Sequence, residues 1–204
     1  MAWSSYNSSG AAKTTGSPTF VTTLPTGSDG QEVYYQSTAA GTGGGASNSM
    51  STVGAVWHLR FRSTASGGNA TYPWEFVGGA ALYAVVLTDQ ALSAGTGWQN
   101  LATAGPIITA PLKGTYRWQA QSQNYDTTTA QSTIGVSVND AAPATLADEA
   151  STSGQTIGKG QEVPLVGEGL VSTAGHTVKL KYIRTSGTTN FRRRRLQIIP
   201  IRVG

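Results

Sequence analysis

The sequence contains no cysteine, which excludes disulfide bonds and cysteine-based zinc sites. Charged residues make up only 12% of the chain, so it resembles neither a charged disordered tail nor a helical bundle. The longest apolar runs fall well short of the roughly 18 residues of a membrane span, and the first twenty residues lack the pattern of a signal peptide. We therefore expect a cytoplasmically made protein, not inserted into a membrane, that is stabilised by burial or by assembly.

Small and polar residues are abundant instead. The chain of 204 residues has 26 glycines together with many serines, threonines and alanines. This composition suits short strands joined by polar turns. The length is sufficient for one β-rich domain and a smaller module.

Residues 1–19 show no sustained apolar period, and they contain the isolated aromatic residues Trp3 and Tyr6. We expect a flexible arm here. Because aromatic side chains are costly to leave in water, we expect Trp3 and Tyr6 to anchor the arm on a partner. A frayed terminus is the alternative interpretation.

Residues 20–79 carry three strand patterns separated by turn signals and glycine-rich loops. The second pattern, AVWHLRFR, alternates so that Trp57, Leu59 and Phe61 share one face, while His58 lies on the polar face. The patterns predict a small antiparallel β module that depends on a neighbour for stability.

Residues 80–204 contain short apolar segments at regular intervals and no helical period. The segments cover residues 82–89, 106–123, 133–140, 161–170, 176–185 and 196–203. This spacing favours a jelly-roll β-sandwich, so the predicted fold class is all-β, a small module followed by a sandwich.

Residues suited to catalysis are scattered along the chain. His58 and His176 have no second histidine at metal-binding spacing, and both are interpreted as surface residues. The segment TSGQTIGKG departs from a phosphate-binding loop at Ser153 and after Lys159. We expect no enzymatic activity and no cofactor.

The carboxylates are equally unsuited to chemistry. Asp148 and Glu149 are adjacent, so a strand would point them to opposite faces. Asp140 and Asp148 are a weak calcium candidate without the usual ladder of acidic ligands. We expect no metal site.

The segment QSQNYDTTTAQST is predicted to be a loop, and it contains Asn124, Tyr125 and Asp126. Aromatic faces bind apolar sugar faces, while amides and carboxylates bind hydroxyl groups. These three residues are therefore host-ligand candidates, and an ordinary surface loop is the alternative.

Four consecutive arginines, Arg192–Arg195, precede the last apolar segment. On a regular strand Arg192 and Arg194 would share one face, and Arg193 and Arg195 the other. From residue 169 onward there are eight bases and no acid, whereas the rest of the chain has six bases and ten acids. We expect an intersubunit or inter-module charge cluster in which the arginines pair with acids. The acids considered are Asp148, Glu149, Glu162 and Glu168. A solvated strand and anion or nucleic-acid binding are the alternatives.

Three motifs in residues 24–79, DGQEVYYQ, VWHLRFR and YPWEFVGG, resemble a module of tail-associated proteins of tailed bacteriophages. The segments ITAPLKGTYRWQAQ, GHTVKLKY and LQIIPIRV resemble the trimeric jelly rolls of the tumour-necrosis-factor and complement globular-head type.

These resemblances imply a non-enzymatic homotrimeric virion protein, a tail appendage whose arm binds other virion proteins and whose jelly roll contacts the host surface, including a cell-surface glycan. A capsid decoration or head-fibre trimer is the alternative, and a polyanion-binding module is a third class. Nucleic acid is not expected as a partner.

Overall fold

The computed structural model describes residues 20–37, 55–93, 95, 97–126, 131–143, 149–152, 160–184 and 186–204. In these ranges the chain forms β-strands and one short 3-10 turn, Thr64–Ser66. Within the same ranges, no helix is long and apolar enough to cross a membrane. The all-β prediction is confirmed.

The N-terminal module contains strands β1 (Phe20–Val21), β2 (Glu32–Gln36), β3 (Val56–Phe61) and β4 (Trp74–Gly79). Strands β2, β3 and β4 pair antiparallel, as the three sequence patterns predict, and β1 adds to β2 in parallel. The buried face carries Trp57, Leu59 and Trp74 because alternate residues of a strand point the same way.

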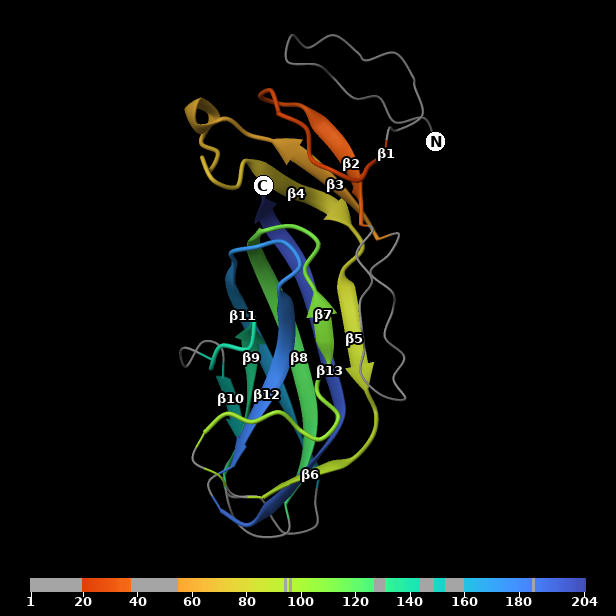
Figure 1. Ribbon diagram of the computed structural model, residues 1–204, viewed down its shortest axis with the longest axis vertical. Helices are drawn as coiled ribbons and strands as arrows, with labels where there is room; N and C mark the ends of the chain where they lie inside the picture. The colour runs from red at the N-terminus through yellow and green to blue at the C-terminus, as the bar shows by residue number, and fades with distance from the viewer. Residues whose placement is uncertain are drawn as a thin grey trace.

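The rest of the chain forms two sheets that pack face to face, as Figure 1 shows. The larger sheet continues with β5 (Leu82–Val86), β6 (Gln90–Ser93), β8 (Gly114–Asp126), β11 (Gly160–Val171) and β13 (Thr188–Val203). The smaller sheet has the order β10-β9-β12-β7, with bounds Glu149–Thr152, Ser132–Val138, Thr177–Arg184 and Ile107–Thr109. This arrangement confirms the predicted jelly-roll β-sandwich.

The core lies between the two sheets. Leu180 of β12 and Leu196 of β13 are fully buried, and the rings of Tyr182 and Phe191 lie 4.8 Å apart across the interior. Because β12 alternates, its residues Lys179 and Lys181 point to the other face of the smaller sheet.

The module and the sandwich share one sheet. The end of β13 pairs with β4, with Arg202 opposite Glu75 and Val203 opposite Trp74. In Figure 1 the C-terminus accordingly lies beside β4. The core also crosses the junction, since the rings of Trp57 and Tyr116 pack edge to face at 6.2 Å. The chain passes from the module to the sandwich at residues 79–82. The hydrogen-bonded sheet and the apolar core both continue from one part into the other.

Candidate binding site

The outer face of the larger sheet, the face turned away from the core, is rich in amide side chains. Strand β8 determines this because its alternate residues face opposite sides. The core side of β8 carries Tyr116, Trp118, Ala120, Ser122 and Asn124, all buried. The outer side carries Arg117, Gln119, Gln121 and Gln123. The result is a polar surface on a rigid four-strand platform of β11, β8, β13 and β5.

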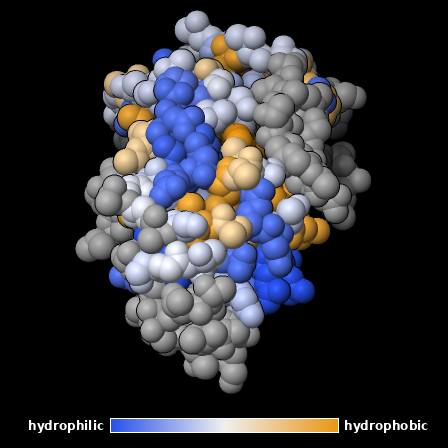
Figure 2. Space-filling model, turned by 60° about the horizontal axis from the view of Figure 1, so that its bottom comes forward, coloured by the Kyte–Doolittle hydropathy of each residue, from blue (hydrophilic) through white to orange (hydrophobic). Residues whose placement is uncertain are grey.

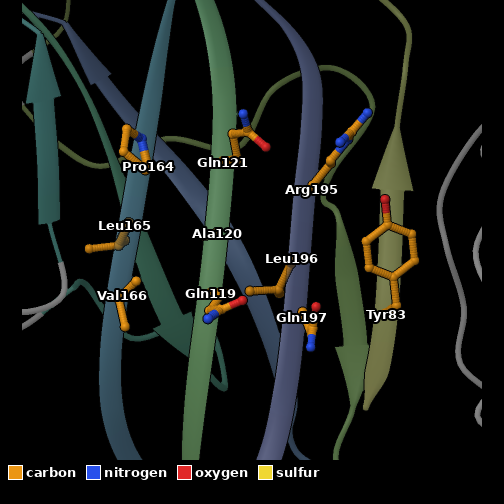
Figure 3. Close-up of a pocket in the computed structure, with 10 residues that line it drawn as sticks. All are labelled: Tyr83, Gln119, Ala120, Gln121, Pro164, Leu165, Val166, Arg195, Leu196 and Gln197. Atoms are coloured by element: carbon orange, nitrogen blue, oxygen red, sulfur yellow. The ribbon is translucent and has the colours of Figure 1, made fainter. Parts of the chain in front are cut away.

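A shallow pocket of about 360 Å³ lies on this face. Figure 3 shows its lining residues on the four strands: Tyr83, Gln119, Ala120, Gln121, Pro164, Leu165, Val166, Arg195, Leu196 and Gln197. We call this site the sheet pocket. Ala120, Leu165 and Leu196 are buried against the core, so the other seven side chains form the accessible surface.

The strand register arranges these side chains in two rows. Val166, Gln119, Gln197 and Tyr83 are directly opposite one another on successive strands and form the first row. Pro164, Gln121 and Arg195 form the second row. Because residues opposite one another share a face, both rows project from the same side of the sheet.

The polar side chains of the sheet pocket have no partner in the described part of the chain. Gln119, Gln121, Gln197, Tyr83 and Arg195 make no side-chain hydrogen bond, ion pair or ring contact there. On the same strand as Gln119, by contrast, Arg117 donates to Glu168 at 2.7 Å. Amides both donate and accept, and the guanidinium donates only. The pocket can therefore bind a ligand with several hydroxyl groups and a negative charge.

The arginine run does not alternate as predicted, because β13 has a β-bulge between Arg192 and Arg195. Arg192 is opposite Gln123 and Arg195 is opposite Gln121, so these two arginines share the outer face. Arg193 is the extra residue, with a φ of 49°. Arg194 is opposite Val86 on the core side. The prediction that Arg192 and Arg194 share one face is therefore wrong. A bulge adds one residue to the strand, so every later side chain moves to the opposite face from the one that regular alternation predicts.

Arg194 is fully buried within the sandwich. Its guanidinium donates to the carbonyl oxygens of Thr103, Gly105 and Thr88 at 3.2 to 3.3 Å, and to Oε1 of Gln90 at 2.9 Å. The same group lies 5.7 Å from the ring centre of Tyr182. The prediction of an intersubunit charge cluster is wrong for Arg194, because its partners are carbonyl and amide oxygens of its own subunit.

Arg192 lies near Asp89, with 4.0 Å between Nη1 and Oδ2, and 5.8 Å from the ring centre of Tyr125. Arg193 and Arg195 are exposed. Asp89 was not among the acids expected to pair with the run. In the sequence, Asp89 stands out only as the last residue of the apolar segment 82–89.

Of the four acids that were expected as partners, the two whose side chains are described lie elsewhere. Glu168 pairs with Arg117 at 2.7 Å, and Glu162 is exposed with no partner among the described residues. Asp148 lies outside the described residues. Only the backbone of Glu149 is described, and it is opposite Gly135.

Asn124, Tyr125 and Asp126 form the end of strand β8, so the predicted loop is wrong at these positions. Asn124 is fully buried, donates to Oγ of Ser132 at 3.1 Å and accepts from Oγ of Ser122 at 2.8 Å. A buried amide with satisfied partners is structural and does not reach a ligand at the surface. Tyr125 is partly exposed and contacts Arg192 as described above. The side chain of Asp126 is not described.

The arm residues Trp3 and Tyr6 lie outside the described residues, as does the whole of 1–19.

His58 lies on the outer face of the module, where it bonds Glu32 at 2.9 Å and stacks on Tyr34. Arg60 donates to the same carboxylate. Although burial opposes ionisation, hydrogen bonds from Arg60 and His58 hold the pKa of Glu32 below its usual value.

Asp140 bonds Nζ of Lys179 at 2.5 Å and lies 3.4 Å from that of Lys181. The hydrogen bond from Lys179 is the main cause that lowers the pKa of Asp140. Two ammonium groups already surround this carboxylate, which opposes cation binding there. In the described ranges no group of three acidic, histidine or cysteine residues converges on a metal position.

Another side of the molecule is shown in Figure 2. There, hydrophobic residues form a patch that is flanked by two hydrophilic areas.

The sequence indicated one component of the sheet pocket. The alternation of Gln119 and Gln121 with buried residues was visible in WQAQ. That Tyr83, Arg195 and Gln197 lie beside them depends on the pairing of β13 with β5 and β8, which no local pattern encodes.

No family model matches the chain, and no curated protein matches it. The solved structures to which it is similar include the Eiger TNF of S. frugiperda, with 11% identity, 61% of this chain and 94% of that chain covered, and a TM-score of 0.43. Murine APRIL has 14% identity, with 67% and 85% of the two chains covered and a TM-score of 0.31. A xylanase 10B from Clostridium thermocellum, solved as CBM22-1 and GH10 modules with xylohexaose, has 12% identity, with 60% and 26% covered and a TM-score of 0.26.

Proposed function

We propose that the chain is a non-enzymatic structural protein of a bacteriophage virion, a homotrimeric tail appendage that contacts the host surface. The observation that supports this most directly is the sheet pocket, an accessible site whose polar side chains have no described partner and which lies on rigid strands. The three phage-like motifs support the proposal from the sequence side. They fall on β2, β3 and β4, the three antiparallel strands of the module.

The module offers surface for attachment to the particle. Phe20, which directly follows the expected arm, is 53% exposed, and Val77 on β4 is 45% exposed. Assembly with other virion proteins would remove this apolar surface from water. In this arrangement the arm and module bind the particle, and the sandwich with its sheet pocket is directed outward.

The oligomeric state is tested by light scattering on the purified protein. A homotrimer has three times the chain mass of 21.1 kDa. A monomer would contradict the trimer and leave a single-chain appendage.

The location is tested by labelling virions with an antibody against the sandwich, viewed by electron microscopy. Label at the tail and inhibition of phage adsorption by free protein are the expected results. Label on the head without such inhibition would support the alternative, a capsid decoration or head-fibre trimer. Absence of label from the particle would overturn both.

A further inference from the structure

We propose that the sheet pocket binds an acidic oligosaccharide, with Arg195 receiving the carboxylate of the sugar and the glutamine amides receiving its hydroxyl groups. The proposal rests on the proposed contact with the host surface, and it names the chemical class of the ligand. It also replaces the expected site at Asn124–Asp126, which forms the end of strand β8 with the side chain of Asn124 buried.

The dimensions of the two rows suit a short oligosaccharide. The first row crosses four strands, and neighbouring strands lie about 4.8 Å apart, so the row extends about 14 Å. The two rows are two residues apart along each strand, which is about 7 Å. A volume of about 360 Å³ lies at the lower end of the range for small-ligand sites. One or two sugar rings fit this area.

The polar groups have the chemistry that hydroxyl groups require. Gln119 and Gln197 are opposite each other and next to Tyr83, which places two amides and a phenol in one line. Each amide can donate to one hydroxyl and accept from another. Because no described partner competes for them, a ligand replaces only water at these groups.

The charge of the pocket indicates the anionic group of the ligand. Arg195 is a cation in a lining that contains no acid. On the same face, Glu168 is already bound by Arg117, and Glu162 lies one row further along and two strands away from Arg195. A guanidinium binds a carboxylate through two parallel hydrogen bonds. A carboxylate on the ligand therefore supplies the ion-pair partner for Arg195 that no acid in the described part of the chain supplies.

The apolar component lies at the β11 side of the pocket. Val166 is 62% exposed, and Pro164 beside it is exposed as well. Sugar rings have an apolar face of C–H groups, and burial of Val166 against that face is favourable.

The test uses the full-length protein and immobilised oligosaccharides that contain uronic or sialic acid, with their carboxyl methyl esters as neutral counterparts. We expect binding of acidic sugars that weakens with added salt, and clearly weaker binding of the esters. Arg195→Gln should reduce affinity about tenfold or more, since hydrogen bonds to charged groups are worth about 1.5 to 3 kcal/mol.

Arg193→Gln is the matched control, because it removes the same charge from the same run at an exposed position outside the pocket. It should change affinity less than about twofold if short-range contacts dominate. The double variant Gln119→Ala with Gln197→Ala should weaken the acidic sugar and its ester alike, as both use the amides. Circular dichroism of each variant checks that the fold is retained.

Three results would overturn the proposal. One is no binding to any acidic sugar of the set. Another is an equal loss of affinity in Arg193→Gln and Arg195→Gln, which would indicate a diffuse charge effect. The third is a fall in molar mass of Arg195→Gln, which would indicate that the pocket lies between copies of the chain.

The virion experiments separate this proposal from the proposed function. If free wild-type protein and free Arg195→Gln block phage adsorption equally well, the ligand assignment fails and the host contact stands. If the antibody finds no protein on virions while the sugars still bind, the virion role fails and the binding site stands.

Discussion

Arg194 is a charged side chain inside the sandwich, and its surroundings explain why the position tolerates it. Burial of an unpaired charge costs several kcal/mol, but three carbonyl oxygens and the amide oxygen of Gln90 accept its hydrogen bonds. The carbonyls belong to the segments around Thr88 and Gly105, which have no strand partner at these points. Arg194 therefore connects two irregular segments to β13.

Replacing Arg194 with alanine should lower the free energy of unfolding by about 3 kcal/mol, because it removes the hydrogen bonds of the guanidinium to three carbonyl groups and to Gln90, and creates a cavity. Urea unfolding measures this change. Arg193→Ala, at the exposed neighbour, is the control and should change stability by less than about 1 kcal/mol. Equal losses in the two variants would contradict the structural role of Arg194.

Asp140 should make stability depend on pH. Its pKa is lowered from 3.8 mainly by the hydrogen bond from Lys179, so its stabilising contribution is present above about pH 4 and is lost as the pH falls through the lowered pKa. Asp140→Asn should be less stable than wild type at neutral pH, by less than the loss in Arg194→Ala, since Asp140 is 62% exposed.

The measurement is the urea midpoint of both proteins between pH 7 and pH 2. The difference between wild type and Asp140→Asn should shrink as the pH falls below 4. A difference that is constant over this range would show that the carboxylate charge is not responsible.

At the scale of the element, the bulge in β13 determines which arginines face outward. Arg193 occupies left-handed backbone, a conformation that costs an L-residue about 1 to 2 kcal/mol and that glycine adopts freely. The bulge inserts one residue opposite Ser122, so Arg195 joins the outer face and Arg194 the core. A regular strand would have placed Arg195 in the interior, given that Arg192 faces outward.

Arg193→Gly should raise the free energy of unfolding by about 0.5 to 1 kcal/mol, since it relieves the left-handed conformation and loses only an exposed side chain. Arg193→Val should lower it, because a branched Cβ is strained at positive φ. Thermal and urea unfolding of both variants test this order. Equal stability of the two variants would mean that the bulge is absent or is located elsewhere.

At the scale of the whole molecule, the module depends on the sandwich. Nε1 of Trp57 donates to the carbonyl of Ala80 at 2.8 Å, directly at the junction. The buried end of β13 places Val203 beside Trp74, and Arg202 bonds Glu75 at 3.0 Å. Because sheet and core are continuous, we expect the two parts to unfold together.

Ending the chain at Pro200 removes the pairing of β13 with β4, and it should selectively accelerate hydrogen exchange in the module strands β2 and β3. Arg202→Gln, which removes only a partly exposed ion pair, is the control and should cost no more than about 1 kcal/mol. Exchange followed by mass spectrometry measures both. Unchanged protection of β3 after truncation would show that the module is stable by itself.

The alternation of apolar residues was sufficient to predict the regular strands and their buried sides. Trp57 and Leu59 on β3, and Val178 and Leu180 on β12, point inward as their sequence pattern indicates, because side chains on a strand repeat every two residues. The same reasoning failed at Asn124, since a polar residue in a threonine-rich segment resembles a loop until hydrogen-bond partners such as Ser132 are known.

The sequence by itself determined that the chain is all-β, that it lacks disulfides, and that basic residues are concentrated toward its end. Only the tertiary structure decided where these bases lie, because the β-bulge at Arg193 and the pairing of β13 with β5 and β8 are long-range features. They divide four adjacent arginines among the core, the bulge and the outer face. They also bring Arg195 beside Tyr83, more than one hundred residues earlier in the chain.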